Sequence, residues 1–462
     1  MHPAGHIARG YAQKPFYSRQ SVKLAFRNVT VIRARLAPLL RLGFEYFVAH
    51  VATRLLAAAG ALLLVRLLPV NEYGFFTIAL SAFLFISTAS DLGVTETLSY
   101  FRLRAAKNGR SWAPYFRAVM SLRIHLFFVG FGLAAIYIAY TASRVGTQSS
   151  SILAVTVAVG LAAWFAIQSG IRTYALKLEQ RYRAGYLVEI ANEAVKLVTV
   201  GLAWVGGFAT AFAAMGSVCL GAWLSASVAT RALGPRLQSA TERKAGRRRR
   251  YSGLLLSQIL PILPGTIHFT LQGPLIALLA AYYGSITNVA AVGALGRLGA
   301  LIAVVSGFTA TVFIPRLLAI SDDRIFFRRY LQWWMFMLTF GALVMTGISA
   351  RPDVLLSLLG SSYSGLDKEL LISAATAVIG TWSAFSWHIN RARGWARYQI
   401  YRVPVVVAAQ APLFYLLDFT TTEGVLWFAL GSLFSDFAFQ TAVSIIGFYR
   451  ERMTRSSLGE KH

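Results

Sequence analysis

Long apolar segments separated by short polar ones run along most of the chain. Most are about 20 residues or longer, the length that an α-helix needs to cross ~30 Å of hydrocarbon. Several contain Gly or Pro, which a membrane helix accommodates by tilting or kinking. The pattern predicts twelve membrane-spanning helices, over residues 45–68, 73–101, 118–141, 151–171, 187–207, 208–230, 253–283, 288–315, 331–350, 370–390, 403–419 and 424–449.

The second and eighth predicted helices begin alike. Tyr73-Gly74 opens one, and Val292-Gly293 lies near the start of the other, 219 residues later. Six helices followed by six in the same orientation imply two parallel lobes related by an axis along the membrane normal. The predicted fold is an all-α polytopic membrane protein with two six-helix lobes. Its expected parts are a basic segment 1–44, an N-lobe 45–233, a basic linker 234–252, a C-lobe 253–449 and a tail 450–462.

Composition agrees with a membrane-embedded chain. Of the 462 residues, 56% are hydrophobic and 14% are charged, whereas soluble proteins carry about 25% charged residues. The single cysteine, Cys219, lies in the sixth predicted helix. One cysteine excludes an intrachain disulfide and a cysteine-rich metal site.

The basic residues orient the predicted helices. With the N-terminus inside, 37 of the 45 Lys and Arg fall in cytoplasmic segments and 3 in outer loops. This asymmetry predicts that both termini are cytoplasmic. It also accounts for the net charge of +27 without a nucleic-acid partner. The run RKAGRRRR at 243–250 is then a loop between two spans, suited to contact with anionic lipid.

The segment 1–44 shows no secretory signal, because it lacks an apolar core of the right kind. Several of its apolar residues fall on one helical face: Val22, Phe26, Val29, Leu36 and Leu40. Such a face is typical of an amphipathic helix lying on the inner leaflet. A disordered basic tail is the alternative.

The loops argue against an enzyme. The outer loops are short, and the longest, 351–369, is half apolar and suited to packing onto the helices. The acidic pair Asp322-Asp323 stands beside Arg324 without a third carboxylate, which favours a solvated loop over a metal site. The sequence shows nothing that resembles a phosphate-binding, glycine-rich loop with its lysine, which argues against an ATP-driven pump.

Charges inside the predicted spans are the candidates for function. An ionisable group at the bilayer centre costs at least ~2.5–3.5 kcal/mol and normally faces a partner or a water-filled cavity. Arg297 and Arg54 both come close to the midplane, one from each lobe. Each either binds an anionic substrate or locks helices together, through backbone carbonyls or through Asp436 of the twelfth span. Arg66, near a helix end, snorkels without a special role.

Further polar residues lie in other spans. One face of the fifth carries four, at helical spacing: Glu189, Asn192, Glu193 and Lys196. They form either an internal salt bridge or a cavity wall with a titratable carboxylate. Asp91 lies near the inner end of the second span, where water reaches it, and the proline-rich seventh span carries His268 and Gln272.

Three stretches carry a family resemblance. RLLPVNEYGFFTIALSAFLFISTASDLGVTETLSYF at 66–101 resembles a signature in which an L-P-x-x-x-Y-G turn enters a long helix that ends in D-L-G. LLGSSYSGL at 358–366 resembles an L-x-G-x-x-Y stretch, and VGALGRLGALIAVVSGFTATVFIPRL at 292–317 looks like the eighth span of the same proteins. These are the oligosaccharide (O-unit, Wzx-type) flippases of the multidrug/oligosaccharidyl-lipid/polysaccharide (MOP) exporter superfamily.

The resemblance implies a function. Such proteins move undecaprenyl-pyrophosphate-linked oligosaccharides across the bacterial cytoplasmic membrane by alternating access around a cationic cavity, for cell-surface polysaccharides such as lipopolysaccharide and exopolysaccharide. It implies a polysaccharide polymerase and a chain-length regulator as partners, with H⁺ or Na⁺ coupling and no other cofactor.

Together with the residues, the resemblance suggests roles for the intramembrane charges. A guanidinium suits pyrophosphate, because it stays charged and binds in a forked geometry. The substrate-binding candidates are Arg297, Arg54, Lys196, Gln272 and His268. The candidates for coupling or counter-charge are Glu189, Glu193, Asp91 and Asp436.

Two alternatives remain open. A cation or drug antiporter of the related multidrug-extruding branch would need an acidic cavity, for which the glutamates of the fifth span are the best support. A membrane glycosyltransferase or polysaccharide polymerase is disfavoured by the short loops.

The predicted topology is testable with reporter fusions. Because of the charge asymmetry, we expect fusions at Gly146, Ser285 and Ser362 to report outside, and fusions at Gly109 and Gly246 to report inside. An inside signal at Ser285 would overturn the arrangement of two parallel lobes.

Overall fold

The computed structural model describes residues 48–49, 51–107, 111–144, 148–234, 263–302, 313–318 and 322–459, and the single residues 146, 260, 305, 309 and 320. Throughout this part of the chain the regular structure is helical. The predicted surface helix in 1–44 lies outside the described residues, as does the predicted linker 234–252 apart from Gly234.

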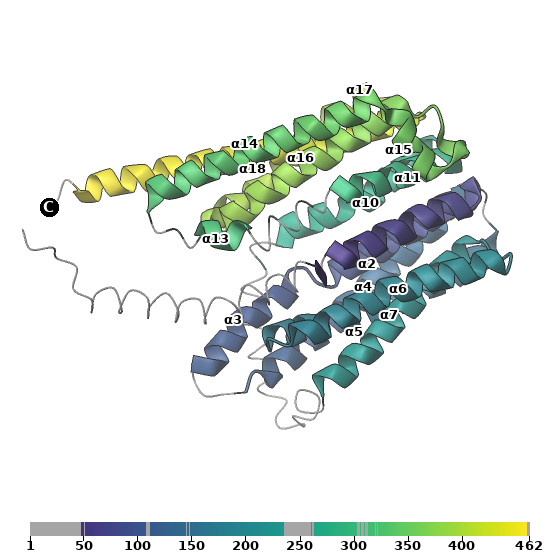
Figure 1. Cartoon of the computed structure of the whole chain (residues 1–462), viewed down its shortest axis with the longest axis horizontal. Helices are drawn as coiled ribbons and strands as arrows, with labels where there is room; N and C mark the ends of the chain where they lie inside the picture. The colour runs from purple at the N-terminus through teal and green to yellow at the C-terminus, as the bar shows by residue number, and fades with distance from the viewer. Residues whose placement is uncertain are drawn as a thin grey trace, which may run out of the picture. The chain divides into compact units, whose positions relative to one another are not determined.

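Every predicted span contains a described helix (Figure 1), which confirms the all-α membrane fold. The first covers residues 51–67. The rest of the first lobe comprises α2 (Val70–Ala89), α3 (Val94–Lys107), α4 (Ala113–Arg144), α5 (Ser149–Leu178), α6 (Tyr182–Val205) and α7 (Ala211–Leu233). The second lobe comprises α10 (Leu263–Tyr283), α11 (Ile286–Ile302), α13 (Ile314–Leu318), α14 (Asp323–Ala350), α15 (Pro352–Leu359), η2 (Ser361–Tyr363), α16 (Asp367–Ala392), η3 (Trp395–Tyr401), α17 (Arg402–Leu416) and α18 (Thr422–Gly459).

Eight of the described helices are long and apolar enough to cross a membrane. The other spans are shorter, as in α11 and α17, or more polar, as in α6. The predicted spans 187–207 and 208–230 adjoin each other at Gly207 without a loop. The structure shows a helix break there, because α6 ends at Val205 and α7 begins at Ala211. Thr210 caps α7, its hydroxyl accepting from the Ala213 backbone N–H at 3.2 Å.

The second predicted span is two helices instead of one. α2 ends at Ala89 and α3 begins at Val94. Leu92 and Gly93, with φ of 40° and 78°, adopt the left-handed conformation that ends a helix. The Asp91 carboxylate then accepts hydrogen bonds from the backbone N–H and hydroxyl of Thr95, at the start of α3. The D-L-G stretch is therefore a capped turn.

Two other predicted boundaries also change. The long outer loop folds into α15 and η2, and Leu356, Leu359 and Tyr363 are buried, so it packs back onto the helices as expected. α18 continues to Gly459, ten residues beyond the predicted span and into the predicted tail.

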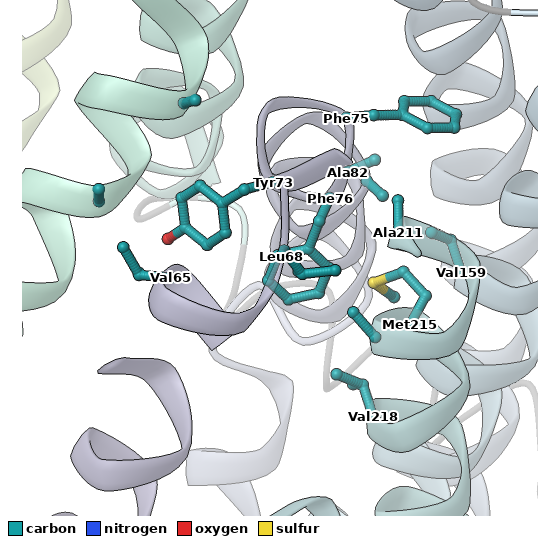
Figure 2. Packing of buried hydrophobic residues seen from close by; sticks show 14 of the residues in the cluster. Val65, Leu68, Tyr73, Phe75, Phe76, Ala82, Val159, Ala211, Met215 and Val218 are labelled. Carbon is teal, nitrogen blue, oxygen red and sulfur yellow. The ribbon is translucent and has the colours of Figure 1, made fainter. Parts of the chain in front are cut away.

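α2 contributes to the largest hydrophobic core and joins the two lobes. It packs on α4, α5 and α7 of its own lobe and on α10 and α11 of the other. In Figure 2, Tyr73 projects from α2 to the side opposite Phe75, Ala211 and Met215. One helix therefore has two buried faces, and its aromatic residues Tyr73, Phe75 and Phe76 are at most 5% exposed.

Two glycines allow α2 and α11 to approach closely. A Cβ on Gly74 would lie 2.6 Å from the Ile286 carbonyl oxygen, and a Cβ on Gly293 would lie 2.4 Å from the Thr77 hydroxyl. Small residues permit such backbone contact between membrane helices. These are the two glycines that begin the second and eighth predicted spans alike, and each packs on the helix that carries the other.

The close approach predicts a selective effect of added side chains. Gly293→Val should lower the unfolding free energy by about 1–3 kcal/mol, because an overpacked contact must move apart. Gly296→Val is the matched control, since a Cβ there meets nothing within 4 Å. Thermal unfolding of the detergent-solubilised protein measures both, and equal effects of the two variants would contradict the interpretation.

Candidate functional site

Arg297 lies where the two lobes meet. Its Nε donates a hydrogen bond to the Tyr73 hydroxyl of α2 at 3.4 Å. Tyr73 is fully buried and Arg297 is half-buried. A guanidinium carries five N–H donors, and among the described residues this phenol is its partner. The charge is thus held at the interface without a carboxylate in the described part of the chain.

Tyr363 belongs to the same buried cluster as Tyr73 and Leu298. Its hydroxyl is buried and has no hydrogen-bond partner among the described residues. Burial raises the pKa of Tyr363, and the nearby Tyr73 adds to the rise. Tyr73, Arg297 and Tyr363 come from the three stretches that carry the family resemblance, so the fold brings those stretches together. We call these three residues the interlobe contact.

Arg54 has different surroundings. It is exposed on the helix over 51–67, and no described carboxylate forms an ion pair with it. Arg66 is also exposed, as expected for a snorkelling residue.

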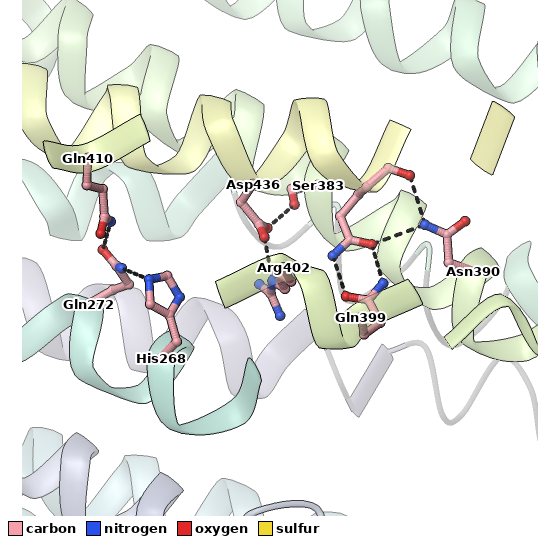
Figure 3. A network of polar contacts seen from close by, with 9 residues as sticks. His268, Gln272, Ser383, Asn390, Gln399, Arg402, Gln410 and Asp436 are labelled. Carbon is pink, nitrogen blue, oxygen red and sulfur yellow. Dashed lines mark hydrogen bonds and ion pairs between the residues drawn. The ribbon is translucent and has the colours of Figure 1, made fainter. Parts of the chain in front are cut away.

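Asp436 is the counter-charge of a different arginine from those expected. Its Oδ1 accepts from Arg402 Nε at 2.5 Å and its Oδ2 from the Ser383 hydroxyl at 2.5 Å (Figure 3). Arg402 and Asp436 are each 8% exposed. The alternative in which Asp436 locks Arg54 or Arg297 is therefore not found among the described contacts. Arg402 begins α17, and its side chain turns into the lobe although its position in the sequence indicates an inner loop.

A polar network fills the second lobe between α10, α16, α17 and α18 (Figure 3). At one end Gln272 Nε2 contacts His268 Nε2 at 3.0 Å, and Gln272 Oε1 accepts a hydrogen bond from Gln410 Nε2 at 3.2 Å. At the other end Gln399 and Gln440 exchange hydrogen bonds of 2.9 and 3.1 Å. Satisfied networks of this kind rigidify a core. His268 and Gln272 are thus joined to each other and to α17.

The polar face of α6 lines a cavity in the first lobe. Lys196 pairs with Glu193 at 2.9 Å, and Asn192 also donates to Glu193 at 2.7 Å. Glu189 pairs with Lys177 of α5 at 2.6 Å. The cavity is about 290 Å³, and Lys177, Glu189, Asn192 and Lys196 line it. The salt bridges and the cavity wall therefore coexist. Lys196 pairs with Glu193, and Lys177 neutralises the other carboxylate of this face, Glu189.

Asp91 also has a cationic partner. Arg123 of α4 lies 3.6 Å from its Oδ1 and donates to the Thr95 hydroxyl at 2.9 Å. Arg123 is 6% exposed. This group ties the turn between α2 and α3 to α4.

The described residues contain no cluster of His, Cys, Asp or Glu that suits a metal ion. Asp322, of the acidic pair, instead caps α14, its carboxylate accepting from the backbone N–H of Arg324 at 2.8 Å and of Ile325 at 3.1 Å.

Sequence reasoning missed the partners of several charges. Lys177 and Arg402 were counted as loop residues, because each lies at the end of an apolar segment. Tyr73 appeared only as part of a motif. One local signal placed Arg402 in a helix. Pro404 follows it by two residues, and proline favours the first turn of a helix.

Comparisons with known proteins agree on the fold. No family model and no curated sequence matches the chain. Among solved structures, an inward-facing multidrug resistance MATE family transporter of the MOP superfamily aligns with a TM-score of 0.59 at 14% identity, over 88% of this chain and 96% of that one. The lipid II flippase MurJ, in an inward closed conformation, aligns with a TM-score of 0.60 at 13% identity, over 87% and 86%.

A MATE transporter of Vibrio cholerae aligns with a TM-score of 0.57 at 13% identity, over 90% of this chain and 98% of that one. These likenesses show that the chain has the fold of MOP-superfamily membrane transporters and flippases.

The Arg402–Asp436 pair predicts a non-additive effect on stability. Arg402→Gln or Asp436→Asn alone should cost about 3–5 kcal/mol, because each leaves a buried charge unpaired. The double variant should recover a large part of that loss, since neither charge remains. Thermal unfolding in detergent measures this cycle, and a double variant as unstable as the sum of the singles would contradict the pairing.

Proposed function

We propose that the protein is a flippase for lipid-linked oligosaccharides. Its substrate is a glycan on undecaprenyl pyrophosphate, moved from the inner to the outer leaflet of the bacterial cytoplasmic membrane for cell-surface polysaccharide synthesis. The glycan and the pyrophosphate do not cross hydrocarbon unaided, whereas the prenyl tail stays in lipid. The polymerase and chain-length regulator of such a pathway are the proposed partners.

The observation that carries this proposal is Arg297. Among the described residues, this half-buried guanidinium on an apolar helix is held by one long hydrogen bond, to a neutral phenol. Such a charge is expensive in a membrane, and intramembrane charges therefore commonly mark functional sites. Its remaining N–H donors suit the forked oxygens of a pyrophosphate.

The pairing of the carboxylates disfavours a cation antiporter. Each of the four carboxylates singled out from the sequence has a basic partner: Asp91 with Arg123, Glu189 with Lys177, Glu193 with Lys196, and Asp436 with Arg402. A cavity for organic cations requires uncompensated negative charge, and these four residues do not provide it. An anionic substrate is the better match for Arg297.

The interlobe contact also suggests how the substrate is coupled to movement. The lobes meet through α2 against α10 and α11, and Arg297 reaches across that interface to Tyr73. A pyrophosphate offers Arg297 charged acceptors, which bind more strongly than a phenol. Substrate binding thus replaces the bond between the lobes and favours their separation, as alternating access requires. Coupling to H⁺ or Na⁺ is part of the proposal.

Substitutions at Arg297 test this role by complementation of glycan export. Arg297→Lys should keep part of the transport, because the charge survives while the fork is lost. Arg297→Ala and Arg297→Glu should abolish it at normal protein levels. Loss of a charged hydrogen bond costs about 1.5–3 kcal/mol, roughly a ten- to hundredfold loss of affinity.

Two further variants separate binding from locking. Arg66→Ala, at an exposed residue near a helix end, is the control and should export normally. Tyr73→Phe removes the partner of Arg297 and leaves its charge, so export should persist if Arg297 binds substrate. Normal export by a well-expressed Arg297→Ala variant, or equal loss in Tyr73→Phe and Arg297→Ala, would end the claim.

A further inference from the structure

An apolar cavity of about 420 Å³ lies in the second lobe, between α11, α14, α15 and α16. Its walls are aliphatic and come from all four helices: Leu295, Leu298, Leu343, Ile348, Leu355 and Leu370. It is separate from the polar network of Figure 3, and none of the residues of that network lines it.

The cavity separates α14 from α11. In the described part of the chain, α14 packs on α13, α15 and α16, and the cavity lies on its side toward α11. A Cβ on Gly347 of α14 would meet nothing within 4 Å. Leucines of both helices line the space, among them Leu298 of α11 and Leu343 of α14, and an aliphatic space takes an apolar occupant in preference to water.

The cavity opens toward the surroundings of the protein. Two of its lining side chains, Leu343 and Val354, are 68% and 54% exposed. The surroundings of a membrane-spanning chain are hydrocarbon tails, which can enter an apolar opening without losing hydration.

Arg351 supplies one charge at the edge of this apolar space. It lines the cavity and is exposed, and no described carboxylate forms an ion pair with it. It is one of only three basic residues in the predicted outer loops, so its position beside the cavity is not part of a general basic surface. An apolar space with an arginine at its edge complements a lipid that carries a phosphate.

We propose that this cavity binds one acyl chain of an anionic diacyl phospholipid, whose phosphate contacts Arg351. The chain fills the space between α14 and α11 and packs on Leu295 and Leu298, the neighbours of Arg297 on α11. A bound lipid thus supports the helix that carries the interlobe contact. The proposal does not depend on which substrate the protein transports.

Native mass spectrometry of the full-length protein released from nanodiscs tests the site. In phosphatidylglycerol nanodiscs the natural chain should retain one tightly bound lipid more than Gly347→Phe, whose ring fills the cavity. Gly132→Phe is the matched control, because Gly132 of α4 is an exposed helical glycine with open space around it. Equal retention by the two phenylalanine variants, both monodisperse, would overturn the proposal.

The headgroup contact is tested separately. Arg351→Gln should lower retention of phosphatidylglycerol roughly tenfold or more, as expected for loss of a charged hydrogen bond. It should lower retention of phosphatidylcholine less, because the choline cation already offsets the charge of that lipid's phosphate. Lys368→Gln, at an exposed residue on α16, is the control. An equal effect of the two substitutions would overturn the role of Arg351.

The source of the lipid is decided by competition. Undecaprenyl phosphate added at an equimolar amount should not displace the bound phosphatidylglycerol. Displacement would overturn the phospholipid assignment in favour of an isoprenoid tail. Because these measurements do not involve glycan export, their failure is distinguishable from failure of the proposed function.

Discussion

The close contact of α2 and α11 is the constraint on which the rest of the structure depends. α2 packs on both lobes, since one side meets helices of its own lobe and the other meets α10 and α11. Gly74 and Gly293 let the backbones approach, and Arg297 then reaches Tyr73. Because the hydrophobic effect does not drive helix association inside a membrane, such close packing and interhelical hydrogen bonds hold the helices together. The contact of α2 with α11 is the most extensive between the two lobes, and α2 and α4 also pack on α10.

Charge is distributed differently within the lobes and between them. Inside each lobe the carboxylates named from the sequence form pairs, of which Asp436–Arg402 in the second lobe and Glu189–Lys177 in the first are examples. Paired charges add little net field and tie helices together. Arg297, at the boundary, has a neutral partner in the described part of the chain, and no described carboxylate offsets its charge. This contrast separates residues that hold a lobe together from the residue that we propose binds substrate.

The sequence predicted the helices well and the side-chain partners poorly. Apolar length and Gly or Pro positions identify spans, because the bilayer imposes one length on all of them. The break at Leu92 and Gly93 was missed, since hydrophobicity alone does not reveal backbone conformation. Asp436 was named from the sequence as a counter-charge, but its partner Arg402 was not, because pairing depends on which helices pack together. Arg297 was identified from the sequence, because an isolated charge in an apolar helix stands out without knowledge of its neighbours.

The capped turn between α2 and α3 has a mechanical consequence. α3 packs on α4 and α5, both in its own lobe, whereas α2 contacts both lobes. A continuous helix through this region would transmit any tilt of one end to the other. The break at residues 90–93 interrupts such a rod, so α2 and α3 meet their neighbours as two separate helices. Asp91, Thr95 and Arg123 fix the α3 side of the break within one lobe, whereas α2 is held from both sides, by α4, α5 and α7 of its own lobe and by α10 and α11 of the other.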